Sequence, residues 1–421
     1  MRILLIGAGG VGEAVVKLAA TRNFFEHIVV ADYDLNRAEH AVDWVQDSRF
    51  SAIKIDAGSA SSIVDVCRQQ NITHILNAVE PKFVPTIFSA AFTAGVNYVD
   101  MSMSISEAHE TDPFHQPGIK LGDAQYAVSE QWERAGKLAL VGMGVEPGLS
   151  NVFARYAQDY LFSDIDEVAI KGGSNLVIRN EVGEEIFAPT FSNWTTIEKY
   201  LNPPLLWNEA KGFYTTQPFS EPEIFDFPEG IGSVECVNVE HEEVAMLPRT
   251  IRAKKVSVKY GLGREFIQVL KTLNQLGLDR TKTIRVRSAQ GPVDVSPRDL
   301  VAAVLPNPAS IGASMTGKTC AGVLVTGKDK DGRERVTYLY NTVDNQWSMD
   351  NFQTQCVVLQ TAFNPLIALE LMAEGIWRGA GVLGPECFDP KPFLDLMSAS
   401  TGYQVEWKTQ ERLSAAPLRH P

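Results

Sequence analysis

The sequence predicts an α/β protein: a Rossmann doubly wound parallel sheet with an inserted α+β domain for substrate binding and dimerisation. Three observations predict this fold class. Short β-branched runs alternate with helical patterns over residues 1–150, a glycine-rich turn follows the first run, and the pattern changes from about Asn151. A chain of 421 residues is also long enough for two domains.

The first 150 residues contain a βα series. The predicted strands are RILLI at 2–6, HIVVAD at 27–32, SAIKID at 51–56, HILNAV at 74–79, VNYVD at 96–100 and LALVGM at 138–143. Helical patterns follow them, starting near Gly10, Leu35, Ser61, Lys82 and Ala124. Parallel strands joined in this way bind ligands at their carboxyl ends. Residues 1–150 are therefore predicted to be a dinucleotide-binding domain.

Residues 151–350 show longer strand-like runs, such as DEVAIKGG at 166–173 and IRAKKVSVKYG at 251–261, separated by proline-rich loops. Asp331-Gly332 lies between two such runs and predicts a hairpin over 321–340, because these residues tolerate the positive φ of tight hairpin turns. The apolar helical pattern from Phe352 to Gly379 predicts that residues 351–421 return to the first domain.

Composition excludes several kinds of partner. The formal charge of −13 opposes binding to nucleic acid or to anionic membranes. No apolar run is long enough to predict a membrane span, and the glycines near the N-terminus interrupt any signal-peptide pattern. The five cysteines are odd in number and scattered, which argues against disulfides and zinc. We expect a cytoplasmic protein.

A dinucleotide-binding motif, Gly7-Ala8-Gly9-Gly10-Val11-Gly12, directly follows the first strand and opens a helix. Gly7 makes the tight turn, Gly9 lets the pyrophosphate approach the backbone, and Gly12 lets helix and strand pack closely. The helix N-terminus supplies amide donors and a positive dipole. Gly10 and Val11 belong to the same loop, so we expect the whole loop to hold the cofactor.

The strand that ends at Asp32 indicates which cofactor is bound. Its carboxylate can accept hydrogen bonds from a ribose 2′-hydroxyl and would repel a 2′-phosphate, which favours NAD. NADP remains the alternative, because Arg37 could pair with that phosphate. Asp56, Asn77 and Ala78, at the ends of later strands, are further expected cofactor contacts.

Two other segments resemble ligand-binding motifs, but the residues in or around them do not fit those motifs. Residues 312–319 match the phosphate-binding pattern G-x-x-x-x-G-K-T, but they precede a predicted strand instead of a helix. The segment from His241 begins like the zinc motif H-E-x-x-H, yet Ala245 occupies the second histidine position. We therefore expect neither a P-loop nor a metal site.

Polar residues at strand ends are candidates for the substrate site. Glu146, Pro147 and Gly148 follow the last strand of the series, where the nicotinamide should arrive, although the same turn could simply cap a helix. His241 and Glu242 could exchange protons with an amine, and Glu243 could bind an ammonium group, although all three could equally be a solvated charge run. Arg249 is a candidate carboxylate clamp.

The chain as a whole resembles the saccharopine dehydrogenase-like family, which includes saccharopine reductase, lysine 6-dehydrogenase and carboxynorspermidine dehydrogenase. The segments that carry the resemblance are GMGVEPGLSN at 142–151, VEHEEVAMLPR at 239–249, VLPNPASIGASMTGKT at 304–319 and GIWRGAGVLGPECFDPKPFLDLM at 375–397. The last three look like the carboxynorspermidine branch. Phe191-Ser192-Asn193 is instead similar to the substrate loop of saccharopine reductases.

The resemblance implies hydride transfer between a nicotinamide and a carbon bonded to nitrogen, with positioning and charge stabilisation supplying most of the catalysis. It also implies a homodimer and adds Ser102 and Asn193 as substrate contacts. We expect a lysine-derived secondary amine as the substrate. The alternatives are carboxynorspermidine or carboxyspermidine, and a protein that senses dinucleotides without turnover.

Overall fold

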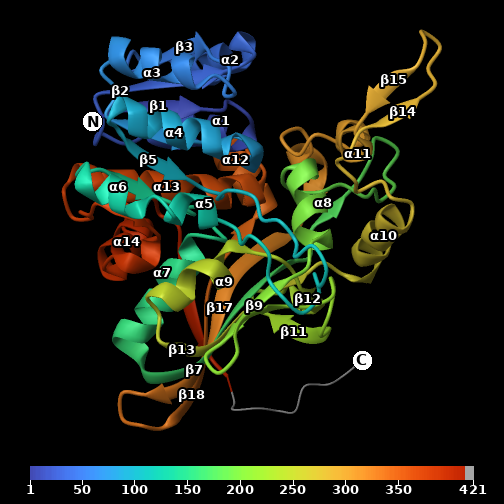
Figure 1. Cartoon of the computed structure of the whole chain (residues 1–421). Coiled ribbons are helices and arrows are strands. Elements are labelled where there is room, and N and C mark those ends of the chain that lie inside the picture. Colours follow the sequence, from blue (N-terminus) through green and yellow to red (C-terminus); the bar gives the residue numbers. More distant parts are fainter. Residues whose placement is uncertain (413–421) are drawn as a thin grey trace.

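The computed structural model describes residues 1–412 (Figure 1). Its N-terminal part is built on a parallel sheet with the strand order β19-β6-β5-β4-β1-β2-β3. The strands are β1 (Arg2–Ile6), β2 (His27–Asp32), β3 (Phe50–Lys54), β4 (His74–Asn77), β5 (Asn97–Asp100), β6 (Leu138–Leu140) and β19 (Gly381–Leu383). The order reverses between β1 and β4, as in doubly wound sheets that bind dinucleotides. The predicted Rossmann sheet is confirmed.

Both faces of this sheet are covered, as a parallel sheet requires. Along β1, Ile3 and Leu5 point into one core, whereas Leu4 and Ile6 point into the other. The helices on the first face are α1 (Gly10–Ala19), α2 (Leu35–Val45) and α13 (Cys356–Ala373). Those on the second face are α3 (Ala60–Gln69), α4 (Val84–Ala94) and α6 (Ser129–Arg134).

The second sheet is mixed and larger. Its strands are β7 (Phe162–Ser174), β9 (Leu205–Asn208), β10 (Gly212–Thr215), β11 (Glu223–Phe227), β12 (Gly232–Asn238), β13 (Ala253–Gly261), β17 (Lys318–Asp329), β18 (Glu334–Asp344) and β20 (Lys408–Glu411). The two runs singled out in the sequence, β7 and β13, lie side by side and parallel, and the other pairs are antiparallel. The predicted α+β character is therefore confirmed.

The remaining elements lie around these sheets. They are α5 (Asp123–Tyr126), α7 (Leu149–Tyr156), η2 (Ala157–Leu161), α8 (Asn193–Leu201), α9 (Glu242–Met246), α10 (Arg264–Gln275), α11 (Pro297–Val304), α12 (Asn345–Phe352) and α14 (Pro390–Ser398), the small pairs β8 (Val177–Ile178) with β16 (Met315–Thr316) and β14 (Ile284–Val286) with β15 (Val293–Val295), and short helices at Pro81–Phe83, Leu247–Arg249, Gly312–Ser314 and Pro385–Cys387. The β14–β15 hairpin projects from the body beside α10 and α11 (Figure 1). 

The predicted hairpin is formed by β17 and β18. Its turn differs from the expected tight one, because only Gly332 adopts a positive φ, of 83°. The Asp329 carboxylate instead accepts hydrogen bonds from the amides of Asp331 and Arg333, which supports a longer loop. Lys318 begins β17, so the P-loop-like segment leads into a strand, as the sequence indicated.

The chain returns to the first sheet before the second one is complete. β19 pairs with β6 across an insertion that runs from Leu140 to Gly381, and α13 packs against α1. β20 does not return, because it pairs with β18 of the second sheet. The boundaries at 150 and 350 stay predictions, and residues 413–421 of the last segment lie outside the described residues.

Helix α13 is long and apolar enough to satisfy the length and composition of a membrane span. In the fold, however, 78% of its apolar window is buried. It contacts α1 on one side and α14 on the other, so its apolar surface serves as protein core.

Candidate functional site

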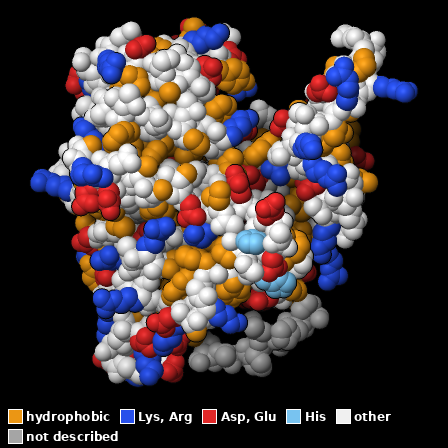
Figure 2. Space-filling view, in the orientation of Figure 1, with side chains coloured by type: hydrophobic (Ala, Val, Ile, Leu, Met, Phe, Trp, Pro, Cys, Tyr) orange, Lys and Arg blue, Asp and Glu red, His pale blue; other side chains and the backbone are white. Residues whose placement is uncertain are grey.

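A cavity of about 1650 Å³ runs from the glycine loop to the second domain. Figure 2 shows the surface hollowed between the Rossmann part and the projecting β14–β15 hairpin. The lining of the cavity includes most of the predicted cofactor residues, namely Gly7, Gly9, Gly10, Val11, Asp32, Arg37, Asp56, Asn77 and Ala78. It also includes four of the predicted substrate or catalytic residues, namely Ser102, Glu146, Asn193 and His241. A single cavity therefore connects the two sets.

The glycine loop has the geometry that a pyrophosphate needs. Gly7 has a φ of 106°, which favours glycine. A Cβ on Gly12 would lie 1.8 Å from the carbonyl oxygen of Gly7, so any side chain there would separate helix from strand. A Cβ on Gly9 would meet no described atom within 4 Å, so the space above it is open for a ligand.

Asp32 is anchored to the loop as well as facing the cavity. Its Oδ2 accepts a hydrogen bond of 2.8 Å from the Ala8 amide, and its Oδ1 accepts one of 3.0 Å from the Asp34 amide. The guanidinium of Arg37 lies 5.4 Å from the centre of the exposed Tyr33 ring at the rim of the cavity. Asp32 and Arg37, the two charged residues expected to affect the choice between NAD and NADP, therefore both lie at this end of the site.

The hydrogen bonds of the Asn77 side chain determine where β4 ends. Asn77 Oδ1 accepts a hydrogen bond of 3.1 Å from the Val79 amide, and its Nδ2 donates to the Tyr98 hydroxyl at 2.9 Å. These bonds turn the chain away from the sheet after Asn77, two residues earlier than predicted. Ala78 and Val79 thereby come to line the cavity.

Glu146 reaches the cavity from the loop after β6. Its Oε1 accepts a hydrogen bond of 3.1 Å from the Gly322 amide of β17. Burial raises the pKa of this carboxyl to about 8, with the nearby carboxylate of Glu243 adding to the effect. Pro147 and Gly148 do not line the cavity: both are buried in the turn that leads into α7.

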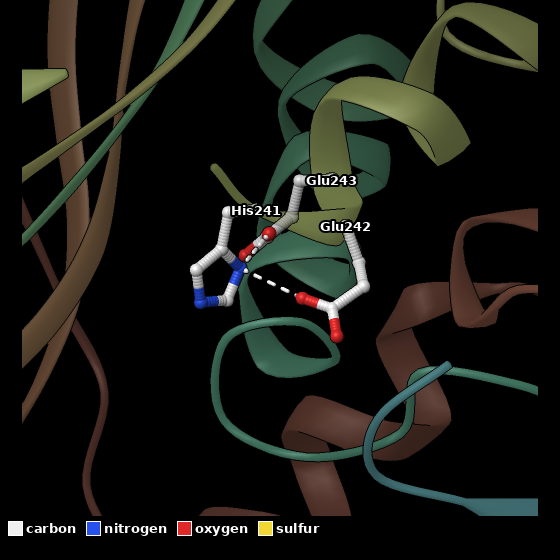
Figure 3. Close-up of side chains that lie close together, drawn as sticks. All are labelled: His241, Glu242 and Glu243. Carbon is white, nitrogen blue, oxygen red and sulfur yellow. Dashed lines mark hydrogen bonds and ion pairs between the residues drawn. The ribbon is translucent and has the colours of Figure 1, made fainter. Parts of the chain in front are cut away.

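His241, Glu242 and Glu243 form a buried cluster at the start of α9 (Figure 3). His241 Nδ1 lies 2.5 Å from Glu243 Oε2 and 3.2 Å from Glu242 Oε2. Both glutamate side chains are fully buried. The alternative considered from the sequence, a run of charges exposed to solvent, is therefore wrong. Only His241 of the three lines the cavity.

Each glutamate in the cluster has further partners. Lys199 Nζ donates to both oxygens of Glu242, at 2.8 and 3.1 Å, and the Ser102 hydroxyl donates to it at 3.0 Å. Burial alone would raise the pKa of Glu242, but Lys199 and His241 lower it to about 2. Ser150 donates to Glu243 at 2.8 Å. Glu242 is therefore a permanent anion that holds Lys199 and Ser102 in place.

The three side chains also meet a simple distance criterion for metal binding, because one ligand atom from each lies within 4.8 Å of the others. Their ligand atoms already have partners within the protein: Lys199 Nζ pairs with Glu242, and His241 Nδ1 lies against Glu243. We keep the expectation that no metal binds here.

Arg249 lies outside the cavity lining. Its guanidinium lies 3.8 Å from the centre of the Tyr126 ring, and its Nε donates to the Ala245 carbonyl at 3.2 Å. The geometry gives its predicted contact with a substrate carboxylate no support. Asn193 does line the cavity. Its Nδ2 donates hydrogen bonds to the carbonyl oxygens of residues 302, 305 and 306 at the end of α11.

The sequence missed three residues that shape the site: Lys199, Tyr260 and Gly172. Lys199 gives no local signal, because its partner Glu242 is 43 positions away. Tyr260 follows the alternation of β13 and looks like any strand residue, yet its hydroxyl lies 2.9 Å from His241 Nε2. Gly172 could have been found as part of a glycine pair inside a strand, which marks a close approach of other groups.

Comparisons with known proteins agree with this geometry. The family described as "Saccharopine dehydrogenase NADP binding domain" matches residues 3–140, and "Saccharopine dehydrogenase C-terminal domain" matches residues 144–403. The chain belongs to the saccharopine dehydrogenase family. It is thus an NAD(P)-dependent oxidoreductase that acts on CH–NH groups, which confirms the predicted cofactor class and reaction.

Relatives within this family cover nearly the whole chain. The carboxynorspermidine synthase of Vibrio alginolyticus is 29% identical over 429 residues, covering 100% of this chain and 99% of the relative. The carboxyaminopropylagmatine dehydrogenase of Synechocystis sp. is 25% identical, covering 93% and 94%. Apo saccharopine dehydrogenase (L-Glu forming) from Saccharomyces cerevisiae shares the fold, with a TM-score of 0.64, 13% identity and coverage of 98% and 99%.

Proposed function

We propose that this member of the saccharopine dehydrogenase family interconverts a carboxylated polyamine and its imine with NAD(P). The observation that carries the proposal is the single cavity that joins the glycine loop to Glu146 and His241. A substrate bound between them would place its carbon–nitrogen bond near the nicotinamide end of the cofactor. Hydride would then pass between the nicotinamide and the carbon, while a proton passes to or from the nitrogen.

The wall of the cavity suits a cationic, flexible amine. Aromatic side chains line it, namely Phe187, Phe191, Trp194, Tyr200, Tyr260 and Phe266. Ring faces attract ammonium groups and pack against methylene chains. Asn193 Oδ1 is buried without a hydrogen-bond partner among the described residues, so it can accept a hydrogen bond from a substrate N–H group.

The names of the relatives favour the polyamine alternative over the lysine-derived substrate first expected from the sequence. Carboxynorspermidine and carboxyaminopropylagmatine, which appear in those names, both denote amines that carry a carboxyl group. The similarity at 13% identity to a saccharopine dehydrogenase supports only the fold. We therefore rank carboxynorspermidine and carboxyspermidine first and saccharopine second.

The deciding experiment follows the absorbance of reduced cofactor at 340 nm with carboxynorspermidine, carboxyspermidine, saccharopine and lysine, each with NAD and with NADP. We expect turnover with a carboxylated polyamine and at most weak turnover with saccharopine and lysine. Preference for saccharopine would restore the lysine-derived assignment. Binding of cofactor without any change in absorbance across the panel would instead support a dinucleotide sensor.

We also propose a cytoplasmic homodimer. All five cysteines are free, and four are buried, as suits a reducing compartment. The β14–β15 hairpin and the adjacent ends of α10 and α11 expose apolar side chains that a second copy could cover, namely Leu276, Ile284, Leu300 and Val304. Sedimentation equilibrium of the full chain tests the dimer: a monomer at micromolar concentration would contradict it.

A further inference from the structure

A line of hydrogen-bonding groups leads from the cavity into the interior of the second domain. It begins at the Glu146 carboxyl, which faces the Tyr260 side chain across Gly172. The Tyr260 hydroxyl lies 2.9 Å from His241 Nε2, and His241 Nδ1 lies 2.5 Å from Glu243 Oε2. The groups alternate between a carboxyl, a hydroxyl, an imidazole and a carboxylate, so protons can pass along the line with only a small movement of the side chains.

The backbone makes room for this line. Tyr260 on β13 and Gly172 on β7 are partners in the parallel register. A Cβ at Gly172 would lie 2.6 Å from Glu146 Oε2 and 2.9 Å from Tyr260 Cε1. Only glycine at this position lets the carboxyl and the phenol meet above the sheet.

Charged groups surround both parts of the line. Glu146 faces the carboxylate of Glu243 and the ammonium of Lys199, as well as Tyr260 and Tyr200. His241 faces both carboxylates of its cluster, Glu242 and Glu243. Burial raises the pKa of the Tyr260 hydroxyl well above its usual value, so this hydroxyl gives up a proton only as it receives another.

We propose that Glu146 is a catalytic residue that exchanges a proton with the substrate nitrogen, and that Tyr260 connects it to His241 as the proton store. This inference rests on the proposed function. In the reductive direction, hydride from NAD(P)H forms the new C–H bond while the Glu146 carboxyl protonates the nitrogen. The Tyr260 proton then moves to Glu146, and the His241 Nε2 proton moves to Tyr260. One hydride and one proton are thus added to the C=N bond, and His241 becomes neutral. In the oxidative direction every transfer reverses.

Two substitutions interrupt the line with little change of shape. Glu146→Gln keeps the volume and replaces the acid by an amide that does not titrate, so kcat should fall by about 10²–10⁴-fold, the usual contribution of a general acid or base. Tyr260→Phe removes only the hydroxyl and should cause a smaller but clear fall. Tyr340→Phe is the matched control, because Tyr340 is a buried tyrosine of the same sheet whose hydroxyl donates to Glu229 Oε1 at 3.4 Å, away from the line.

The pH dependence separates catalysis from folding. The Glu146 pKa of about 8 predicts that wild-type reduction falls above pH 8, because the carboxyl loses the proton that it must donate, whereas amine oxidation rises through the same pH. Glu146→Gln should lose this dependence while keeping its affinity for NADPH, measured by fluorescence titration. The Tyr340→Phe control should keep the wild-type profile. A Glu146→Gln enzyme with the wild-type profile and kcat would overturn the proposal.

A second readout does not need turnover. In protein labelled with ¹⁵N-histidine, the Nε2 signal of His241 should shift as Glu146 titrates, and this response should vanish in Tyr260→Phe. An unchanged response in Tyr260→Phe would overturn the relay. Wild-type turnover together with unaffected variants refutes the relay alone. Absence of wild-type turnover on every amine and imine refutes the proposed function, and the catalytic role of Glu146 falls with it.

Discussion

The buried pair of Lys199 and Glu242 offers a direct test of how the site is held together. Glu242 is fully buried, and its two oxygens accept hydrogen bonds of 2.8 and 3.1 Å from Lys199 Nζ. Lys199→Met keeps most of the aliphatic stem but removes the ammonium group. The carboxylate is then left in the interior with only Ser102 and His241 as partners.

The expected cost is large. Removing one partner of a buried ion pair leaves an uncompensated charge and lowers the free energy of unfolding by about 3–5 kcal/mol. His241 Nδ1 lies 3.2 Å from Glu242 and supplies part of the missing compensation, so we expect a value near the lower end of this range. Adding Glu242→Gln to Lys199→Met removes the stranded charge and should recover part of the loss.

The loss should also depend on pH in a defined direction. The pKa of Glu242 is lowered from 4.5 to about 2 in the folded protein, so its pairing stabilises the fold above pH 4.5 and less as the pH falls toward 2. The difference between wild type and Lys199→Met should therefore be full at pH 7 and shrink in acid.

Urea unfolding followed by far-UV circular dichroism measures these differences. Lys254→Met is the matched control, because Lys254 pairs with Asp164 and Asp166 but is about half exposed, where such pairs contribute little. Equal losses for Lys199→Met and Lys254→Met at pH 7 would refute the argument from burial. A loss that stays constant down to pH 3 would show that Glu242 is not the titrating partner.

Three further predictions concern nucleotide binding. Gly9→Val should fold normally and lose NAD(P)H binding, because its side chain points into open space above the loop, whereas Gly12→Ala should fail to fold; normal cofactor titration by Gly9→Val would show that the loop is misassigned. Asp32→Ala should lower NAD affinity by about 1–3 kcal/mol and leave NADP binding no worse, and an unchanged ratio of the two dissociation constants would move the selectivity to another residue. Lys318→Ala should not alter the effect of ATP on the melting temperature, since Lys318 begins a strand; an ATP shift that depends on Lys318 would reinstate the P-loop.

The elements of the Rossmann sheet could be predicted from local sequence. Strand β1 is apolar after Arg2 because both of its faces are buried, and glycine is required at position 12 by a steric limit against nearby Gly7. The Asp331-Gly332 turn likewise marked its hairpin, although the length of the loop depended on the Asp329 side chain. The contact that requires glycine at position 12 and the hydrogen bonds of the hairpin loop both join residues that are close together in the sequence.

The substrate side of the site could be predicted only in part. The sequence singled out Glu146 and His241 as chemically capable groups, but it gave no sign that Tyr260 joins them. Arg249 was chosen for its charge, yet the fold places that charge over an aromatic ring. Charge type is local information, whereas the direction of a side chain depends on the strands packed around it.

The sequence by itself determined that the chain has a parallel sheet, a dinucleotide loop and a set of acidic residues after it. Only the tertiary structure decided which of those acids are ionised. Glu242 meets Lys199 across 43 positions and has a pKa of about 2, whereas Glu146 meets a backbone amide across 176 positions and has a pKa of about 8. The two side chains are chemically identical, and they differ because desolvation and the sign of the nearest charge are set by contacts distant in the sequence.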